Sequence, residues 1–282
     1  MSGGAEHEER AYVYMVRCAG GQLYTGWTND PGARLHAHKT GKGAKATRAM
    51  GAKRFAYLER CAGKSDALRR EAALKKLPKA KKEALCAEWE GKNLPRLSVA
   101  TRADAADILE IYNWYVLNHT ATFQVTPSTL EEYEDWVDNT RKVAPLLLAR
   151  DAEGKLLGYA CAHRYHPREA YDWAVESTIY CAPDARGFGV GDTLYRALLD
   201  ILDGMGYWNV YALVADPNPA SERIHARLGF TCVGREPHTA YKFGWLGLST
   251  WWLPLRRGNE KPEPTHPLTQ EQVEEILGRY QV

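Results

Sequence analysis

From residue 97 onward, apolar and polar residues show two periodicities, one typical of strands and one typical of helices. The stretch 97–117 begins as a strand-like run and continues as a helix that places Ile108, Ile111, Tyr112 and Tyr115 on one face. Strand and helix patterns keep alternating beyond this stretch. We therefore expect this part of the chain to form an α/β unit around one sheet.

The remaining elements of this part are marked by their turn residues. A hairpin is expected over 144–165 with its turn at Glu153 and Gly154, and the β-branched run 174–181 predicts a buried strand. A helix follows, with Leu194, Leu198, Ile201, Leu202 and Met205 on its apolar face and with Gly204 and Gly206 at its end. A strand over 208–215 and a helix over 219–229, with Gly229 at its C-terminal cap, complete the pattern.

The first hundred residues carry a shorter pattern. Residues 10–48 start with two strand-like runs joined at Gly20 and Gly21, followed by a helix in which Arg34 and His38 lie one turn apart. A further helix is expected over 66–77, with Ser65 as its N-cap.

Pattern breaks suggest where the parts of the chain meet. Gly91, Asn93 and Pro95 interrupt a helical pattern, and a second break follows Leu255. Residues 256–267 resemble an extended linker that leads to a short amphipathic helix capped by Thr269. These breaks suggest a first domain over 1–92, a second over 93–257, and a linker with a short helix over 258–282.

Charge divides the chain at the same place. Residues 1–95 contain 19 lysines and arginines against 10 acidic residues, whereas residues 96–282 contain 18 against 25. A basic domain suits a polyanion such as nucleic acid, and an acidic one lacks that electrostatic footprint. The alternative is that the lysine-rich helix is only a solvated surface.

Composition sets further limits. No apolar run approaches the roughly 20 residues of a membrane-spanning helix, and the N-terminus lacks the pattern of a secretion signal. The six cysteines are scattered, without a C-x-x-C pair, which favours free thiols in a reducing cytoplasm. We therefore expect a cytoplasmic protein without a membrane partner.

A glycine-rich stretch precedes the helix that starts near residue 190. Gly187, Gly189 and Gly191 alternate behind Arg186, so backbone N–H groups at a helix N-terminus can approach an anion without Cβ obstruction. Read as R-x-x-G-x-G, the stretch resembles the pyrophosphate loop of GNAT acetyltransferases. Residues 102–123, 168–180, 216–230 and 241–245 narrow this resemblance to the phosphinothricin or methionine-sulfoximine acetyltransferase branch.

The resemblance implies a GNAT-fold mixed central sheet flanked by helices and acetyl-CoA as cofactor. The substrate implied is a small amino acid, or an analogue, with a free amine. Glu176 is the candidate general base, because a carboxylate within an apolar strand has a raised pKa; the alternative is a pair with a nearby arginine. His225 either donates a proton to the thiolate or is structural. Relatives commonly form homodimers, for which the tryptophan-rich stretch 244–252 is a candidate, unless it belongs to the core.

The resemblance also assigns the binding residues. The cofactor set is Ile179, Tyr180, Cys181, Arg186, Gly187, Phe188, Gly189, Val190, Gly191, Asp192, Thr193, Asn218 and Ser221. The expected substrate contacts are Phe123, Arg168 and Tyr171, with the arginine available to clamp a carboxylate unless it is only a solvated loop residue.

The basic part resembles the small bacterial GIY-YIG nucleases related to the N-terminal part of the excision-repair incision subunit. Residues 12–14 stand for GIY, with Tyr12 in place of the first glycine, and residues 24–26 stand for YIG. The resemblance implies a small α/β domain with the catalytic set Tyr14, Tyr24, Arg34, His38 and Glu71. Glu71 would bind Mg²⁺ or Mn²⁺, Arg34 would neutralise the phosphate, and the tyrosines would position or deprotonate water. Core aromatic side chains are the alternative for the tyrosines.

Three functions remain open. The chain could be two enzymes, an amino-acid N-acetyltransferase and a nuclease acting on nucleic acid such as DNA. It could be an acetyltransferase whose basic domain only binds nucleic acid. It could also be a non-catalytic adaptor, against which the intact glycine loop and Glu176 argue.

Overall fold

The computed structural model describes residues 11–185 and 189–280. The chain divides into two compact units, and the main boundary between them lies between Leu94 and Pro95. The first unit contains β1 (Ala11–Cys18), β2 (Leu23–Thr28), α1 (Pro31–Lys39), α2 (Lys45–Met50), β3 (Ala52–Cys61), α3 (Lys64–Lys76) and α4 (Lys79–Asn93). Its strands form an antiparallel sheet in the order β2-β1-β3.

The core of the first unit lies around β1, whose residues are almost all buried. The turn expected at Gly20 and Gly21 joins β1 to β2, and Gly21 has the positive φ of 78° that such a turn requires. The expected cap at Ser65 is wrong, because α3 begins at Lys64 with Gly63 before it. Ser65 therefore lies inside the first turn of that helix.

The second unit is built around one seven-stranded sheet. Its strands are β4 (Arg96–Val99), β5 (Leu147–Arg150), β6 (Leu156–Arg164), β7 (Ala174–Cys181), β8 (Asn209–Asp216), β9 (Thr231–Tyr241) and β10 (Trp245–Pro254). Its helices are α5 (Ala105–Asn118), α6 (Leu130–Thr140), α7 (Val190–Gly204), α8 (Pro219–Leu228) and α9 (Gln270–Gly278), with short 3₁₀ turns at Arg102–Asp104, Glu169–Tyr171 and Pro183–Ala185.

The strand order in this sheet is β4-β5-β6-β7-β8-β10-β9. Only β7 and β8 run parallel, and every other neighbouring pair is antiparallel. This is the mixed sheet with flanking helices that the resemblance to GNAT acetyltransferases implies. The glycines expected at turns and caps occupy those places, with φ of 89° at Gly154 and 97° at Gly229.

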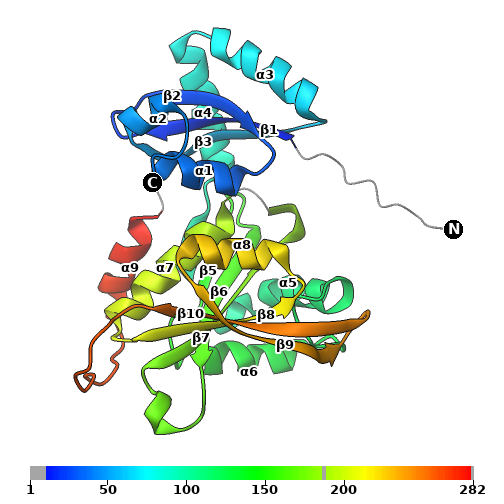
Figure 1. Ribbon diagram of the computed structural model, residues 1–282, viewed down its shortest axis with the longest axis vertical. Helices are drawn as coiled ribbons and strands as arrows, with labels where there is room; N and C mark the ends of the chain where they lie inside the picture. Colours follow the sequence, from blue (N-terminus) through cyan, green and yellow to red (C-terminus); the bar gives the residue numbers. More distant parts are fainter. Residues whose placement is uncertain (1–10, 186–188, 281–282) are drawn as a thin grey trace, which may run out of the picture. The chain divides into compact units, whose positions relative to one another are not determined.

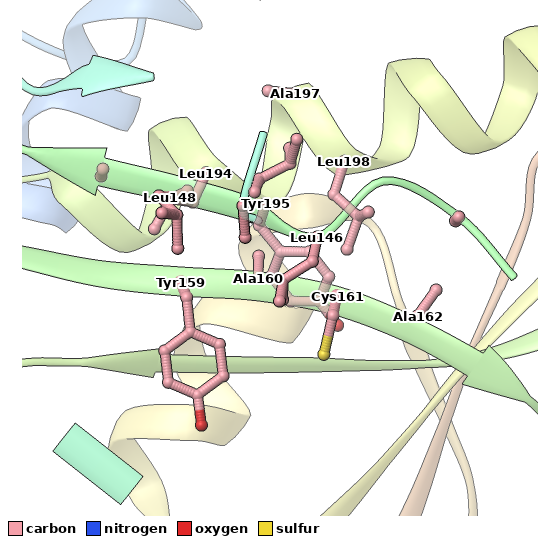
Figure 2. Close-up of a cluster of buried hydrophobic side chains, with 14 of the residues drawn as sticks. Leu146, Leu148, Tyr159, Ala160, Cys161, Ala162, Leu194, Tyr195, Ala197 and Leu198 are labelled. Carbon is pink, nitrogen blue, oxygen red and sulfur yellow. The ribbon is translucent and has the colours of Figure 1, made fainter. Parts of the chain in front are cut away.

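Helices cover both faces of the sheet. In Figure 1, α6 lies on one side and α7 and α8 on the other. Figure 2 shows Leu194 and Leu198 of α7 above β6, while the Tyr159 ring points away from that helix. Tyr159 instead meets Tyr133 of α6, with 3.3 Å between the two hydroxyls. The core thus has one layer on each side of the sheet.

The C-terminal segment belongs to this unit. Thr269 caps α9 with a complete capping box, as the sequence predicts, and Val273, Ile276 and Leu277 are buried in the main core. On the way there, the backbone oxygen of Glu263 accepts a hydrogen bond of 2.7 Å from the Trp173 indole. No helix within the described residues is long and apolar enough to cross a membrane.

Candidate active sites

The two parallel strands of the larger sheet separate after a short contact. β7 and β8 pair only over 174–176 and 209–211, whereas β6 accompanies β7 as far as Cys181. Within the described chain, the stretch 177–181 therefore has no strand on its β8 side. An extended molecule with amide groups can hydrogen-bond along such an edge as an added strand would.

This separation corrects the expectation of a buried strand. The run 174–181 does form β7, but only Val175 and Ser177 are fully buried. Its β-branched composition reflects strand propensity, whereas its burial depends on where β8 diverges. The sequence of β7 alone does not carry that information.

Glu176 lies at the last paired position before the strands diverge. Its register partners are His163 on β6 and Tyr211 on β8. Burial raises the pKa of the Glu176 carboxyl. Among the described residues no basic side chain forms an ion pair with it, so the arginine pair considered from the sequence is not formed within the described part of the chain. Glu176 is thus a half-buried carboxylate directly before the stretch 177–181, whose β8 side carries no strand in the described chain and is called the open edge of β7 below.

Aromatic side chains gather on the same side of the sheet as Glu176. The rings of Tyr165 and Tyr211 stack with centroids 4.0 Å apart, and Tyr171 packs edge-on against Tyr165 at 6.1 Å. The pKa of Tyr165 is raised by burial first and then by the charges of Tyr211 and Glu176. Neither Tyr165 nor Tyr211 was predicted from the sequence. The available signal was the alternation of side chains along the strand 208–215, which decides the face of the sheet on which Tyr211 lies.

The helix after the glycine stretch begins beside the open edge. Gly189 has a φ of 88°, and α7 starts at the next residue. A Cβ on Gly191 would lie 3.3 Å from Cys181 Sγ and 3.4 Å from Ile224 Cδ1, so glycine there lets α7 pack closely on β7. Asp192 pairs with Arg196 and Arg227.

The other described residues of the predicted cofactor set lie on β7 and at the starts of α7 and α8. Ile179, Tyr180 and Cys181 lie on the open part of β7, and Val190 and Thr193 lie in the first turn of α7. The Asn218 side chain caps α8 by accepting a hydrogen bond of 3.2 Å from Ser221 N. The expected contacts at Arg186, Gly187 and Phe188 fall outside the described residues.

His225 is held on both sides of its ring. Nδ1 lies 2.8 Å from Ser221 O, and Nε2 lies 2.9 Å from the hydroxyl of Tyr195, which in turn lies 2.6 Å from Ser177 Oγ. Burial lowers the pKa of His225 to about 4, so the ring is neutral near pH 7. Both nitrogens are already hydrogen-bonded within the protein. This geometry favours the structural alternative for His225.

The candidate substrate residues lie on two loops. Arg168 and Tyr171 are exposed on the connection between β6 and β7, just before the start of β7. Phe123 lies on the loop after α5, where Lys242 Nζ donates to Thr122 O at 2.9 Å. Tyr180, near the far end of β7, donates to Ala121 O of that loop. The two loops therefore approach β7 from opposite ends, with Glu176 between them.

The first unit brings three of its five predicted residues, Tyr14, Tyr24 and His38, into contact. Tyr14 Oη lies 2.8 Å from His38 Nε2, and the Tyr24 ring packs 5.2 Å from the His38 ring. Burial raises the pKa of Tyr14, Tyr24 and Glu71 raise it further, and Arg34 opposes this rise. Tyr14 therefore lies within electrostatic reach of the other members.

Local sequence explains this arrangement. Tyr14 pairs with Gly26 across β1 and β2, and a Cβ on Gly26 would lie only 2.6 Å from Tyr14 Oη. Glycine at this position is therefore required for the tyrosine hydroxyl to sit there. Asp30 caps α1 by accepting from Ala33 N at 2.9 Å, which starts the helix that carries Arg34 and His38.

Glu71 has a partner that was not predicted from the sequence. Its carboxylate is 14% exposed and lies 2.6 Å from Lys75 Nζ, one helical turn later. The spacing i, i+4 was the available signal. Among the described residues no group of three or more His, Cys, Asp or Glu is placed to hold a metal ion. A metal at Glu71 would therefore take most of its ligands from water and from bound phosphate.

Comparison with known proteins agrees with this division. Residues 108–230 match the model of the acetyltransferase (GNAT) family, and residues 10–84 match the GIY-YIG catalytic domain. A phosphinothricin N-acetyltransferase of Streptomyces viridochromogenes is 36% identical over 60% of this chain and 90% of its own length. An L-methionine sulfoximine/L-methionine sulfone acetyltransferase of Pseudomonas aeruginosa is 39% identical over 54% of this chain and 90% of its own.

Solved structures show the same likeness. A phosphinothricin acetyltransferase of Sinorhizobium meliloti in complex with acetyl-CoA is 34% identical, with a TM-score of 0.58 over 60% of this chain and 94% of its own. An acetyltransferase of Salmonella typhimurium, solved with its cofactor acetyl-CoA, is 29% identical, with a TM-score of 0.57 over 59% and 97%.

Proposed function

This chain belongs to the GNAT acetyltransferase family, and we propose that it transfers the acetyl group of acetyl-CoA to the amine of a small amino acid or analogue. The names of its relatives contain phosphinothricin and methionine sulfoximine, and these two compounds indicate the substrate type that we propose. The observation that carries the proposal is Glu176, a half-buried carboxylate without a basic partner in the described chain, at the inner end of the open β7 edge.

The described residues around the edge suit acetyl-CoA. The backbone of Ile179, Tyr180 and Cys181 would pair with the amides of the pantetheine arm. The N–H groups from Gly189 to Thr193 would face its pyrophosphate at the start of α7, where the helix dipole favours an anion. Acetyl-CoA supplies the activated acetyl group.

Glu176 provides the chemistry that an amine substrate needs. Most primary amines are protonated near pH 7 and cannot attack a carbonyl carbon in that form. Glu176 would accept this proton, directly or through a water molecule, and backbone N–H groups would stabilise the developing oxyanion. Arg168 would hold the substrate carboxylate, while Phe123 and Tyr171 would contact its side chain.

The direct test of this function is a thiol-release assay with acetyl-CoA and a panel of free amines. Phosphinothricin, methionine sulfoximine, methionine sulfone and the common L-amino acids would be compared with the same compounds carrying a blocked α-amine. We expect release with at least one free amine and none with its blocked form. Release that is equal with both forms, or absent with the whole panel, would contradict the proposal.

Gly189→Val is expected to weaken coenzyme A binding about tenfold or more. A branched side chain is strained at the φ of 88° found here, and its Cβ would stand where the backbone should approach the pyrophosphate. The measurement is calorimetry with coenzyme A. Gly154→Val is the matched control, because Gly154 has a φ of 89° in a turn outside this site, and a Cβ there would meet no described atom within 4 Å. Equal affinity of the Gly189 variant and the parent would remove Gly189 from the cofactor site.

For the GIY-YIG domain we propose metal-dependent cleavage of nucleic acid, such as DNA. The assembly of Tyr14, Tyr24, Arg34, His38 and Glu71 supports cleavage over mere binding, because binding requires only positive charge.

Lys42, Lys45 and Arg48 are exposed on the segment next to His38 and would contact phosphates. Mg²⁺ or Mn²⁺ bound at Glu71 would stabilise charge on the phosphate. Salt-sensitive binding without cleavage would favour the alternative in which the basic domain only binds nucleic acid.

We also propose that the acetyltransferase unit forms a homodimer. Within the stretch 244–252, Trp251 is 7% exposed and belongs to the core, whereas Trp245 is 63% exposed. Tyr241 and Phe243 on the same hairpin are 68% and 71% exposed. Three large exposed aromatic side chains on one hairpin are typical of an interface.

Trp245→Asp is expected to shift the sedimentation equilibrium from dimer to monomer, because an interface would bury an unpaired carboxylate. Leu68→Asp is the control, since Leu68 is an exposed apolar residue (44%) of the first unit. A parent chain that is monomeric at high concentration, or a dimer that withstands Trp245→Asp, would argue against this interface.

A further inference from the structure

A chain of hydrogen bonds runs behind the Tyr14 hydroxyl in the first unit. Tyr14 Oη lies 2.8 Å from His38 Nε2, and His38 Nδ1 lies 2.6 Å from Thr47 Oγ1. Thr47 Oγ1 lies 2.8 Å from the backbone oxygen of Ala44. The three side chains are almost inaccessible, with exposures of 1% for Tyr14 and His38 and 0% for Thr47. Water therefore has little access to exchange these partners.

The last acceptor fixes the direction of every proton in the chain. A carbonyl oxygen can only accept, so the single hydroxyl proton of Thr47 is donated to Ala44 O. Thr47 Oγ1 then offers only lone pairs to the imidazole, and His38 Nδ1 must carry the proton that it donates. His38 Nε2 is left without a proton and accepts from Tyr14. Burial, and then the charge of Arg34, lower the pKa of His38, in agreement with a neutral ring.

The segment before α2 brings Thr47 to this place. A Cβ on Gly43 would lie 2.4 Å from His38 Nδ1 and 2.9 Å from His38 Cα, so only glycine allows the backbone to pass so close to the ring. The helix that follows places Thr47 over Nδ1, while Lys45 and Arg48 point to solvent. One short helix thus carries both the buried hydroxyl and exposed positive charges.

We propose that Thr47 is a positioning residue that holds His38 in its Nδ1–H tautomer and so keeps Nε2 as the acceptor of the Tyr14 proton. The opposite tautomer would donate from Nε2 to Tyr14 Oη and turn the phenol proton outward. Tyr14 would then present a donor, where its role toward an attacking water requires lone pairs. The consequence for cleavage rests on the proposed nuclease function, whereas the tautomer itself does not.

The test compares Thr47→Val, which keeps the shape but loses the hydroxyl, with Thr47→Ser, which keeps the hydroxyl. Nitrogen-15 NMR of the full chain would report the His38 tautomer, with the His38 signal identified by its loss in His38→Gln. We expect Nδ1–H in the parent and in Thr47→Ser, and an increased share of Nε2–H in Thr47→Val. An Nε2–H ring in the parent, or an unchanged ring in Thr47→Val, would overturn the proposal.

The second readout is metal-dependent cleavage by the same proteins. Thr47→Val should cleave about tenfold to 100-fold more slowly, the range found when a metal-binding histidine loses its outer hydrogen-bond partner. The dissociation constant for nucleic acid should not change, and Thr47→Ser should restore the rate. A tautomer shift with an undiminished rate would overturn the role in cleavage. A parent that cleaves nothing would count against the proposed nuclease function, and the NMR result would still decide the role of Thr47.

Discussion

Glu176→Gln is expected to lower kcat for acetyl transfer about 100-fold or more, with little change in coenzyme A affinity. Glutamine fits the same half-buried position next to the point where β7 and β8 diverge, but it cannot accept the amine proton. The proposed cofactor contacts are backbone groups further along β7 and at the start of α7, which this change leaves intact. Steady-state kinetics and calorimetry separate the two effects.

The pH dependence gives this prediction a second readout. The base must be deprotonated to act, and burial raises the pKa of Glu176. The rate of the parent should therefore decline with falling pH sooner than it would for an exposed glutamate, and Glu176→Gln should lack this acidic limb. Glu153→Gln, which changes an exposed carboxylate in the β5–β6 turn, is the control. If the Glu176 variant kept the rate and pH profile of the parent, another group would be the base.

Glu71→Gln is expected to abolish metal-dependent cleavage and to preserve nucleic-acid binding. The amide is a poor ligand for Mg²⁺ or Mn²⁺, whereas the many Lys and Arg contacts with phosphate do not depend on it. Binding is expected to tighten slightly, because one negative charge near the phosphate is lost and Lys75 is released from its ion pair. The assay would use the full chain with labelled single-stranded, branched and duplex DNA and structured RNA, at several salt concentrations, with and without metal.

Asp66→Asn serves as the control for this experiment. Asp66 lies on the same helix as Glu71 and pairs with Arg69 at 3.0 Å, outside the group around Tyr14. It should cleave like the parent. Cleavage that persists in Glu71→Gln would instead identify a contaminant or another metal site, and equal loss in both variants would indicate damage to α3.

The sequence predicted most of the structure where the signals are local. Strand propensity placed β7 at residues 174–181, and Thr269 correctly marked the start of α9. The open edge of β7 was missed, because it depends on where β8, a strand much later in the chain, diverges. Thr47 was missed as well, since only the packing of Gly43 against His38 brings it to the imidazole. Long-range register and close backbone contacts are the information that periodicity does not contain.

The attachment of α9 also affects how the chain responds to a protease. Three apolar side chains, Val273, Ile276 and Leu277, anchor this helix in the core, each with a burial free energy of about 2 kcal/mol. The preceding segment, 256–267, contains several exposed residues and belongs to no helix or strand. A single cut there would break the covalent link without removing the helix from the core. The cleaved protein would therefore migrate as one species under native conditions and as two fragments in denaturant.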